Sequence, residues 1–337
     1  MKAGSLPETQ APVRIGILGA SSYAPTTLLN PAKENDEVVI SAVGSRELPG
    51  AQAFADKHGI PRAHGSLQAL VEDPNLDAVY VLLPTSLHGR WTRAALEAGK
   101  HVLCEKPFVA NADEAREVAE QAAKSDRVVM EAIQFRHHPL TLRVEEIIAS
   151  GEIGRLQRVD IDLCVLLPTF KGNCYNYDFA GGAMMDAGSY VANMARTFGG
   201  STPEVVSAQA KLRSPQVDRA MTAELRYAGG HTGRIRCALW SSNLFRARAK
   251  VVGDRGELRW LSPAAPNLFP RLSIRSDGRK RVESFPRRAC YDYQLDAFVA
   301  SVLRGVPVRT TPDDAVENLS VIDAVYRAAG LPIRMPS

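Results

Sequence analysis

The chain has 337 residues, of which 45% are hydrophobic and 23% charged, a balance that is typical of a folded globular protein and excludes disorder as its main state. Its formal charge of +4 comes from 41 basic and 37 acidic residues scattered along the chain, which argues against nucleic acid or an anionic membrane as a partner.

Five cysteines without C-x-x-C spacing favour reduced thiols in the cytoplasm over disulfides or a zinc site. The longest apolar run, Ala78–Leu83, is too short to cross a bilayer. Residues 1–12 are polar, lack the apolar core of a signal peptide, and are expected to form a loose, flexible tail.

The first half of the chain alternates short apolar runs with helical stretches. The runs are continuous rather than alternating, as in strands of a parallel sheet with helices on both faces. The β-α-β-α order therefore predicts a doubly wound, Rossmann-type α/β domain over residues 13–132. The expected strands are Val13–Leu18, Val38–Val43, Ala78–Leu83, His101–Cys104 and Val128–Ala132, and the expected helices are Thr26–Asn35, Pro49–His58, Leu87–Ala98 and Ala112–Lys124.

The pattern changes after the turn Ser150–Gly154, where strands follow one another through Gly, Asp and Pro turns. This predicts a second α/β domain over residues 133–337, built on a largely antiparallel open sheet. We expect helices to cover one face of that sheet and an apolar face to remain, which commonly becomes a subunit interface. The expected strands are Leu156–Leu167, Val205–Leu212, Thr222–Tyr227, Thr232–Leu239, Ala247–Val252 and Glu257–Leu261, and the expected helices are Gly182–Phe198, Asp292–Arg304 and Pro312–Ala329.

A glycine turn follows the first expected strand and occupies the place of the dinucleotide fingerprint G-x-G-x-x-G/A. Its first glycine would make the tight turn, and Ala24 would allow the helix to pack closely on the strand. Ser21 stands where the fingerprint has its middle glycine, so the motif is degraded, although a small hydroxyl residue can donate to a phosphate. The predicted pyrophosphate-binding residues are Gly19, Ala20, Ser21, Ser22 and Tyr23.

The residues after the second expected strand bear on the choice between NAD and NADP. An acidic residue there would hold the ribose 2′-hydroxyl of NAD, but this chain has Gly44, Ser45 and Arg46. No carboxylate is present to repel a 2′-phosphate, and the Arg46 guanidinium with the Ser45 hydroxyl can hold one by charge-assisted hydrogen bonds. The alternative is that Arg46 is an ordinary solvated loop arginine. We predict NADP as the cofactor, with NAD as second choice.

A more specific motif surrounds the fourth expected strand. Residues 98–107 read A-G-K-H-V-L-C-E-K-P, which resembles the G-K-H-V-x-x-E-K-P stretch of the glucose–fructose oxidoreductase and inositol dehydrogenase family (Gfo/Idh/MocA). Residues 84–88, 135–139 and 150–154 also resemble segments of that family, and residues 181–190 resemble its catalytic helix. The resemblance covers nearly the whole chain.

The resemblance implies a substrate class and further cofactor contacts. Tyr190 stands where inositol dehydrogenases carry histidine. It is similar to the branch that contains glucose–fructose oxidoreductase, dimeric dihydrodiol dehydrogenase and NADP-dependent xylose dehydrogenase, which implies a sugar or a related cyclic diol. Relatives of this kind imply a homodimer or homotetramer assembled through the second sheet. The further cofactor contacts implied are Leu83, Pro84, Thr85, His88, Glu105 and Lys106.

Three residues could together handle the proton when a secondary alcohol is oxidised. Asp186 and Tyr190 lie four positions apart on one expected helix and therefore share a face, and Lys106 follows a strand at the carboxyl edge where ligands bind. A free phenol, with a pKa near 10, is a poor base at neutral pH, and we expect the lysine cation to lower the pKa of Tyr190. We predict that Tyr190 is the general acid or base and that Asp186 orients the substrate hydroxyl or the lysine; Lys106 could carry the proton instead. An Asp–Tyr pair of this spacing is otherwise usually structural.

Several alternatives are left open by the sequence. The chain could be an NADP-binding regulator without turnover, a glycoside-cleaving enzyme that recycles its cofactor, or a reductase of imines or enones. No metal is expected, because His137 and His138 face different sides of a helix and have no companion ligands. Tyr175, Tyr177 and Phe179 could stack on a sugar or pack in the core.

Overall fold

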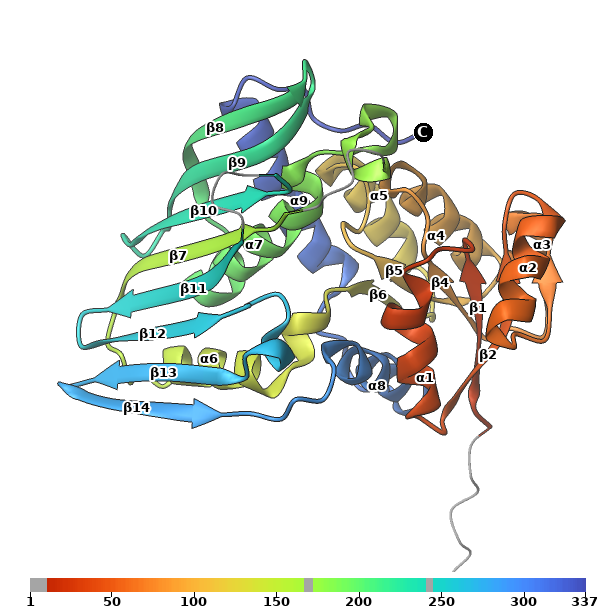
Figure 1. Ribbon diagram of the computed structural model, residues 1–337, viewed down its shortest axis with the longest axis horizontal. Coiled ribbons are helices and arrows are strands. Elements are labelled where there is room, and N and C mark those ends of the chain that lie inside the picture. The colour runs from red at the N-terminus through yellow and green to blue at the C-terminus, as the bar shows by residue number, and fades with distance from the viewer. Residues whose placement is uncertain (1–10, 167–171, 241–244) are drawn as a thin grey trace, which may run out of the picture.

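Two sheets, each with helices packed against it, make up the protein (Figure 1). The structure is a computed structural model that describes residues 11–166, 172–240 and 245–337. The predicted tail therefore lies, up to residue 10, outside the described residues. Within the described ranges no helix is long and apolar enough to span a membrane, and no group of His, Cys, Asp and Glu side chains is arranged to hold a metal ion.

The first sheet is parallel and has the strand order β3-β2-β1-β4-β5-β6, which confirms the predicted doubly wound class. The order reverses between β1 and β4, and in such folds the ligand crevice lies beyond the carboxyl ends of the strands at that point. The short edge strand β3 was not predicted, because two residues carry no periodic signal. The strands are β1 (Val13–Leu18), β2 (Val38–Gly44), β3 (Ala63–His64), β4 (Ala78–Val81), β5 (His101–Glu105) and β6 (Val129–Ala132).

Helices cover both faces of this sheet, as the unbroken apolar strands require. The helix after β1 starts with a π-type turn, η1, before one turn of regular α-helix, where a single helix over residues 26–35 was predicted. The elements are η1 (Pro25–Leu29), α1 (Asn30–Lys33), α2 (Leu48–His58), α3 (Leu67–Val71), η2 (Thr85–Leu87), α4 (His88–Glu97), α5 (Ala112–Ala123) and η3 (Gln134–His137).

The second sheet has the order β14-β13-β12-β11-β7-β10-β9-β8 and is antiparallel except for the pair β7–β10, in agreement with the predicted open sheet. The hairpin of β13 and β14, which turns at Asp277 and Gly278, was not predicted as strands. The strands are β7 (Leu156–Cys164), β8 (Glu204–Ser214), β9 (Val217–Arg226), β10 (Thr232–Ala238), β11 (Arg246–Gly253), β12 (Gly256–Leu261), β13 (Arg271–Ser276) and β14 (Arg279–Ser284).

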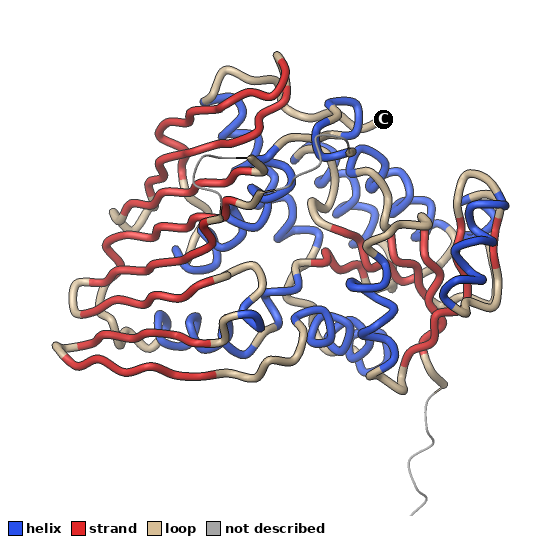
Figure 2. Tube along the Cα trace, in the orientation of Figure 1, coloured by secondary structure: helices blue, strands red, loops and turns tan. Residues whose placement is uncertain are grey.

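Helices α6 (Pro139–Ala149), α7 (Ala183–Gly199) and α9 (Pro312–Ala328) lie on one side of the second sheet, as Figure 2 shows. Helix α8 (Cys290–Arg304) instead returns to the first sheet, where Leu295, Phe298 and Val299 share a buried core with Ile15 and Ile17 of β1. The chain after residue 133 thus packs against both sheets, and the division of domains at residues 132 and 133 stays a prediction.

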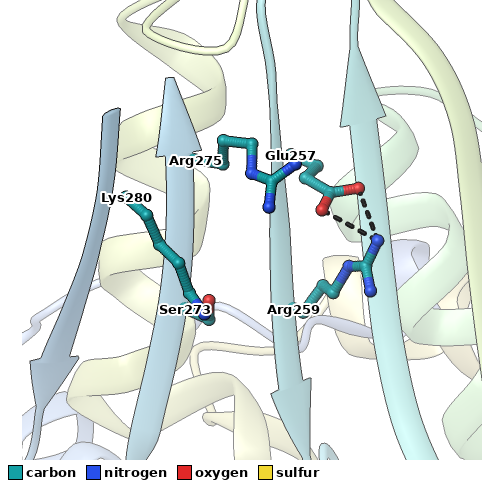
Figure 3. A pocket seen from close by; sticks show the side chains of 5 residues that line it. All are labelled: Glu257, Arg259, Ser273, Arg275 and Lys280. Atoms are coloured by element: carbon teal, nitrogen blue, oxygen red, sulfur yellow. Dashed lines mark hydrogen bonds and ion pairs between the residues drawn. The ribbon is translucent and has the colours of Figure 1, made fainter. Parts of the chain in front are cut away.

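The open face of the second sheet is charged, which corrects the prediction of an apolar face. Asp162 of β7 has only 3% of its side chain exposed and pairs with Arg246 and Arg248 at 3.0 and 2.8 Å. On β12, Glu257 pairs with Arg259 of the same strand (Figure 3) and with Lys250 of the neighbouring strand β11 at 3.1 Å. Cross-strand pairs of opposite charge stabilise a solvent-facing sheet. Polar and apolar residues alternate along β10 and β11 in the sequence itself, and this alternation already indicates one polar face.

The turn between β1 and η1 brings the backbone unusually close to a neighbouring strand end. Gly19 has a φ of +111°, and a Cβ atom built there would lie 2.5 Å from the backbone oxygen of Leu82. Its amide donates to the carbonyl oxygen of Gly44 at 2.9 Å. Only glycine fits such a conformation and such an approach, so Gly19 fixes the start of the crevice between β1 and β4.

We expect Gly19→Ala to lower the free energy of unfolding by roughly 2–4 kcal/mol, because the left-handed backbone and the Leu82 carbonyl both resist a side chain. Gly59→Ala is the matched control: Gly59 also has a positive φ of 68°, but a Cβ atom added there would meet nothing within 4 Å, and the change should cost about 1 kcal/mol. Urea unfolding measures both, and equal losses would mean that the Leu82 contact contributes nothing.

Candidate active site

The predicted pyrophosphate turn is exposed at the end of β1. Ala20, Ser22 and Tyr23 are solvent-exposed, while Ala24 is fully buried against the strand. The Ser21 hydroxyl accepts a hydrogen bond from the Tyr23 amide at 3.3 Å, so it closes its own turn. Within the described ranges the amides of Ala20 and Ser22 form no hydrogen bond with the protein. Two open N–H donors before a helix are the feature that binds phosphate in such folds.

Ser45 and Arg46 follow β2, next to this turn, because β2 pairs with β1. The Ser45 hydroxyl donates to the carbonyl oxygen of Glu47 at 2.6 Å. Arg46 is exposed and forms no ion pair with a described residue. The guanidinium is therefore available to a ligand, and the serine hydroxyl is engaged in its own turn.

The loop after β4 lies beside the glycine turn, since the Leu83 side chain would be 3.1 Å from a Cβ at Gly19. His88 at the start of α4 is 1% exposed. Its Nε2 faces the Leu83 carbonyl oxygen at 2.8 Å and its Nδ1 faces that of Pro107 at 2.9 Å. Burial lowers the pKa of His88, so the ring is neutral and donates to one of the two carbonyls. The predicted contact between His88 and a cofactor does not fit this burial; the histidine instead ties two site loops together.

Lys106 lies directly after β5 and reaches across to α7. Its Nζ donates to the Asp186 carboxylate at 2.6 Å and to the Asp186 backbone oxygen at 3.2 Å. The lysine side chain is 13% exposed and that of Asp186 is 35% exposed. Burial lowers the pKa of Lys106, but the charges of Asp186 and Glu105 outweigh it, and the pKa is raised. The lysine is a cation held between the end of β5 and the first turn of α7.

Tyr190 lies one turn after Asp186, on the same face of α7, as predicted from the spacing. Its hydroxyl donates to the side-chain oxygen of Gln134 at 3.0 Å. The Lys106 Nζ lies over the tyrosine ring, 4.7 Å from its centroid. Burial, and then the charge of Glu105, raise the pKa of Tyr190. The expectation that the lysine lowers this pKa is therefore wrong, because the lysine charge is directed at Asp186 and the phenol is desolvated.

Glu105 precedes the lysine and faces the interior of the first sheet. Its carboxylate accepts a hydrogen bond from the Tyr80 hydroxyl of β4 and one from the Lys106 amide at 3.2 Å. Burial raises the pKa of Glu105, opposed by Tyr80 and Lys106. The charge of Glu105 therefore favours the lysine cation, in addition to the charge of Asp186.

Three residues of this site were not predicted. Gln134 of η3 is 5% exposed and holds the Tyr190 hydroxyl, and Tyr291 of α8 also hydrogen-bonds that phenol. Gln134 adjoins the motif at residues 135–139, which was a usable signal. Tyr80 lies inside an apolar strand run, and Tyr291 is more than 100 residues from its partner, so neither had a local signal.

The chain matches two family models. Residues 13–133 match the oxidoreductase family with an NAD-binding Rossmann fold, and residues 141–259 match the GFO/IDH/MocA C-terminal domain. It is 35% identical to D-xylose 1-dehydrogenase (NADP(+)) 2 of Haloferax volcanii, over 93% of this chain and 96% of that protein. It is 32% identical to trans-1,2-dihydrobenzene-1,2-diol dehydrogenase of Macaca fuscata fuscata, over 74% of this chain and 73% of that one.

Solved structures agree with this assignment. A 3-ketoreductase from Actinomadura kijaniata, crystallised with NADP and TDP-benzene, superposes with a TM-score of 0.85 at 27% identity, covering 94% of this chain and 98% of the other. Aldose-aldose oxidoreductase from Caulobacter crescentus, complexed with glycerol, gives a TM-score of 0.85 at 25% identity, covering 95% and 98%. The family and fold expected from the sequence are both confirmed. The chain belongs to the Gfo/Idh/MocA family of oxidoreductases.

Proposed function

We propose that the protein is an NADP-dependent oxidoreductase that transfers a hydride between the nicotinamide and a secondary alcohol or hemiacetal carbon of a sugar or related cyclic diol. The observation that carries the proposal is the convergence of Lys106, Asp186 and Tyr190 beside the crevice of a dinucleotide-binding fold. A proton donor must lie where hydride is exchanged, and these residues meet there from the end of strand β5 and from helix α7.

The residues around the crevice fit a dinucleotide with a 2′-phosphate. The open amides of Ala20 and Ser22 would hold the pyrophosphate. The exposed Arg46 would hold the 2′-phosphate through its guanidinium. Leu83, Pro84 and Thr85 lie on the adjoining loop, beside the turn. When bound, the nicotinamide supplies or accepts the hydride.

We propose Lys106 as the proton carrier. Its ammonium has three N–H donors, and Asp186 takes two of them, which leaves one for the reacting oxygen of a substrate. In this structure the Tyr190 hydroxyl donates its one hydrogen to Gln134, so it would donate to the reacting oxygen after turning away from Gln134. Both groups hold their protons at neutral pH, a state suited to protonating the alkoxide that forms when a carbonyl is reduced.

The substrate class follows from the site and from the relatives. The two relatives named above are a xylose dehydrogenase and a dihydrobenzene-diol dehydrogenase, so one name gives an aldose and the other a cyclic trans-diol. A cationic donor with a carboxylate beside it suits a substrate that offers adjacent hydroxyl groups, one to react and one to bind Asp186. We therefore favour an aldose or a cyclic trans-diol.

The alternative functions differ in what happens to the cofactor. An NADP-binding regulator needs neither the Lys106–Asp186 pair nor Tyr190, so their alignment favours an enzyme. A glycoside-cleaving enzyme would recycle its cofactor and form no net NADPH. Following NADPH absorbance on a panel of aldoses, cyclic diols, glycosides and imines separates these activities, and net NADPH formation on aldoses or diols is the result that the proposal requires.

We also propose that the protein forms a homodimer or homotetramer through the second sheet. Exposed apolar side chains gather at one end of its central strands, at Trp240, Phe245 and Leu261, beside the charged pairs described above. Such a mixture of apolar and charged groups is common at subunit interfaces. We keep the cytoplasm as its proposed location, because the five thiols are free.

Arg46→Asp should reverse the cofactor preference. The carboxylate would repel a 2′-phosphate and accept a hydrogen bond from a 2′-hydroxyl, so we expect NADP to bind about 100-fold more weakly and NAD to bind as well or better. Titration by nucleotide fluorescence measures both affinities. Arg90→Asp, on an exposed arginine of α4, is the control for charge alone. Unchanged NADP affinity in Arg46→Asp would remove this residue from the site.

Lys106→Met should lower kcat by about 100- to 10,000-fold, while Tyr190→Phe should lower it by about tenfold, because the first loses the proton carrier and the second one hydrogen bond. Lys124→Met, on an exposed lysine, is the control. NADP affinity should stay near the wild-type value in all three, measured by titration. A larger loss in Tyr190→Phe than in Lys106→Met would assign the proton to the phenol.

The raised pKa of Lys106 predicts opposite pH dependences for the two directions. Reduction needs the protonated amine and should stay level from about pH 6 to pH 8. Oxidation needs the neutral amine, whose fraction grows roughly tenfold per pH unit below the pKa, so its rate should rise across the same range. Steady-state rates with NADPH and NADP in matched buffers test this, and an oxidation optimum near neutral pH would contradict it.

A further inference from the structure

One arginine lies completely buried in the segment after α9, far from any predicted site residue in the sequence. Arg334 is 0% exposed. Its Nε donates to the Gly181 carbonyl oxygen at 2.7 Å, and its Nη2 pairs with Asp218 of β9 at 3.2 Å. The guanidinium lies 4.1 Å from the ring centroid of Tyr326 and 5.0 Å from that of Tyr177. Burying an arginine costs free energy unless its N–H donors have hydrogen-bond partners, so the partners of Arg334 indicate what it holds in place.

The arginine organises the start of α7, the helix that carries Asp186 and Tyr190. Asp218, which it neutralises, accepts a hydrogen bond from the Met184 amide at 2.7 Å and so caps the first turn of that helix. Gly182, the residue before α7, has a φ of +144°, and a Cβ there would lie 2.2 Å from the Asp218 carboxylate and 2.8 Å from the Arg334 guanidinium. Gly182 of the catalytic-helix motif is therefore needed to let this ion pair approach.

The segment after α9 also contacts two elements of the first domain, α5 and η2. The Arg334 carbonyl oxygen accepts from the Asn111 side chain at 2.7 Å, and Asn111 caps the first turn of α5. The Ser337 amide donates to the Ser86 carbonyl oxygen at 3.0 Å, and the two hydroxyls lie 2.7 Å apart. Ser86 belongs to η2, inside the loop expected to contact the cofactor.

We infer that residues 331–337 form a strap that positions both walls of the crevice, and that Arg334 is a positioning residue for the reaction. It acts through Asp218 and Gly181 on the first turn of α7, which carries Asp186 to Lys106. Tyr177, which donates to the Ile333 carbonyl oxygen at 3.1 Å, belongs to this strap rather than to a sugar-stacking surface. The inference rests on the proposed function for its kinetic consequences only.

Arg334→Met tests the strap on the substrate side, with Arg334→Lys as the conservative variant and Arg327→Met, on an exposed arginine of α9, as the control. The measurements are KM and kcat at saturating NADP, NADP affinity by fluorescence, and hydrogen exchange of residues 172–186. Small displacements of catalytic groups cost up to about 100-fold in rate. We expect kcat/KM to fall at least tenfold in Arg334→Met and less in Arg334→Lys, exchange to rise in 172–186, and NADP affinity to stay within twofold.

A folded Arg334→Met variant with kcat/KM within twofold of wild type would overturn the inference. So would equal losses in kcat/KM and NADP affinity together with faster exchange throughout the chain, since that pattern is general destabilisation. If Arg334→Met does not fold, Tyr177→Phe decides: it removes one hydrogen bond to the strap and should raise exchange in 172–186 and lower kcat/KM about threefold, whereas no change in either would overturn the inference.

Deletion of residues 335–337 tests the cofactor side. We expect faster exchange of residues 84–88 and weaker NADP binding by at least about threefold, with residues 172–186 unchanged; unaltered exchange and affinity would overturn this half of the inference. Hydrogen exchange is measured without enzymatic turnover, so its result does not depend on the proposed function. An inactive wild-type protein with the expected exchange pattern would therefore reject the proposed function and leave the strap standing.

Discussion

The ion pair between Lys106 and Asp186 joins the two halves of the molecule at the point where chemistry is expected. The lysine directly follows strand β5, at the carboxyl end of the first sheet, and the aspartate lies on α7, a helix that covers the second sheet. A partly buried pair of this kind adds little to stability, because desolvation offsets much of its attraction. The ion pair instead holds α7 in position relative to β5 and favours the charged form of the Lys106 amine.

The surroundings of the pair control where its protons reside. Glu105 lies below the lysine, and Tyr80 donates to that carboxylate from the next strand. Asp186 and Glu105 raise the pKa of the Lys106 ammonium, and burial raises the pKa of the Tyr190 phenol. Both shifts favour the protonated form of the group before any substrate arrives. This arrangement differs from the lysine-activated phenolate that the spacing of the residues alone suggested, since desolvation depends on packing that spacing does not report.

Most of the fold could be predicted from the sequence, because most strands are either continuous apolar runs or alternate between apolar and polar residues. It failed where those signals are weak: β3 has two residues, and β14 reads Arg-Lys-Arg-Val-Glu-Ser with one apolar side chain. In the site, motifs located Lys106, Asp186 and Tyr190, and helical spacing explained why two of them share a face. Tyr291 was missed because contacts between distant segments leave no periodic trace, whereas Gln134 was missed although it adjoins the motif at residues 135–139. The role of His88 depends on two backbone carbonyls that only a folded chain brings together.

The return of α8 to the first sheet bears on how the chain reaches its native state. Phe298 and Val299 complete a core whose other members begin at residue 13. During synthesis the nucleotide-binding half therefore emerges with one flank of its sheet uncovered, and it keeps apolar surface open to water until nearly 300 residues have been made. The two halves are then built together rather than in succession, and the nucleotide-binding half could not be exchanged between relatives by a single cut at residue 133.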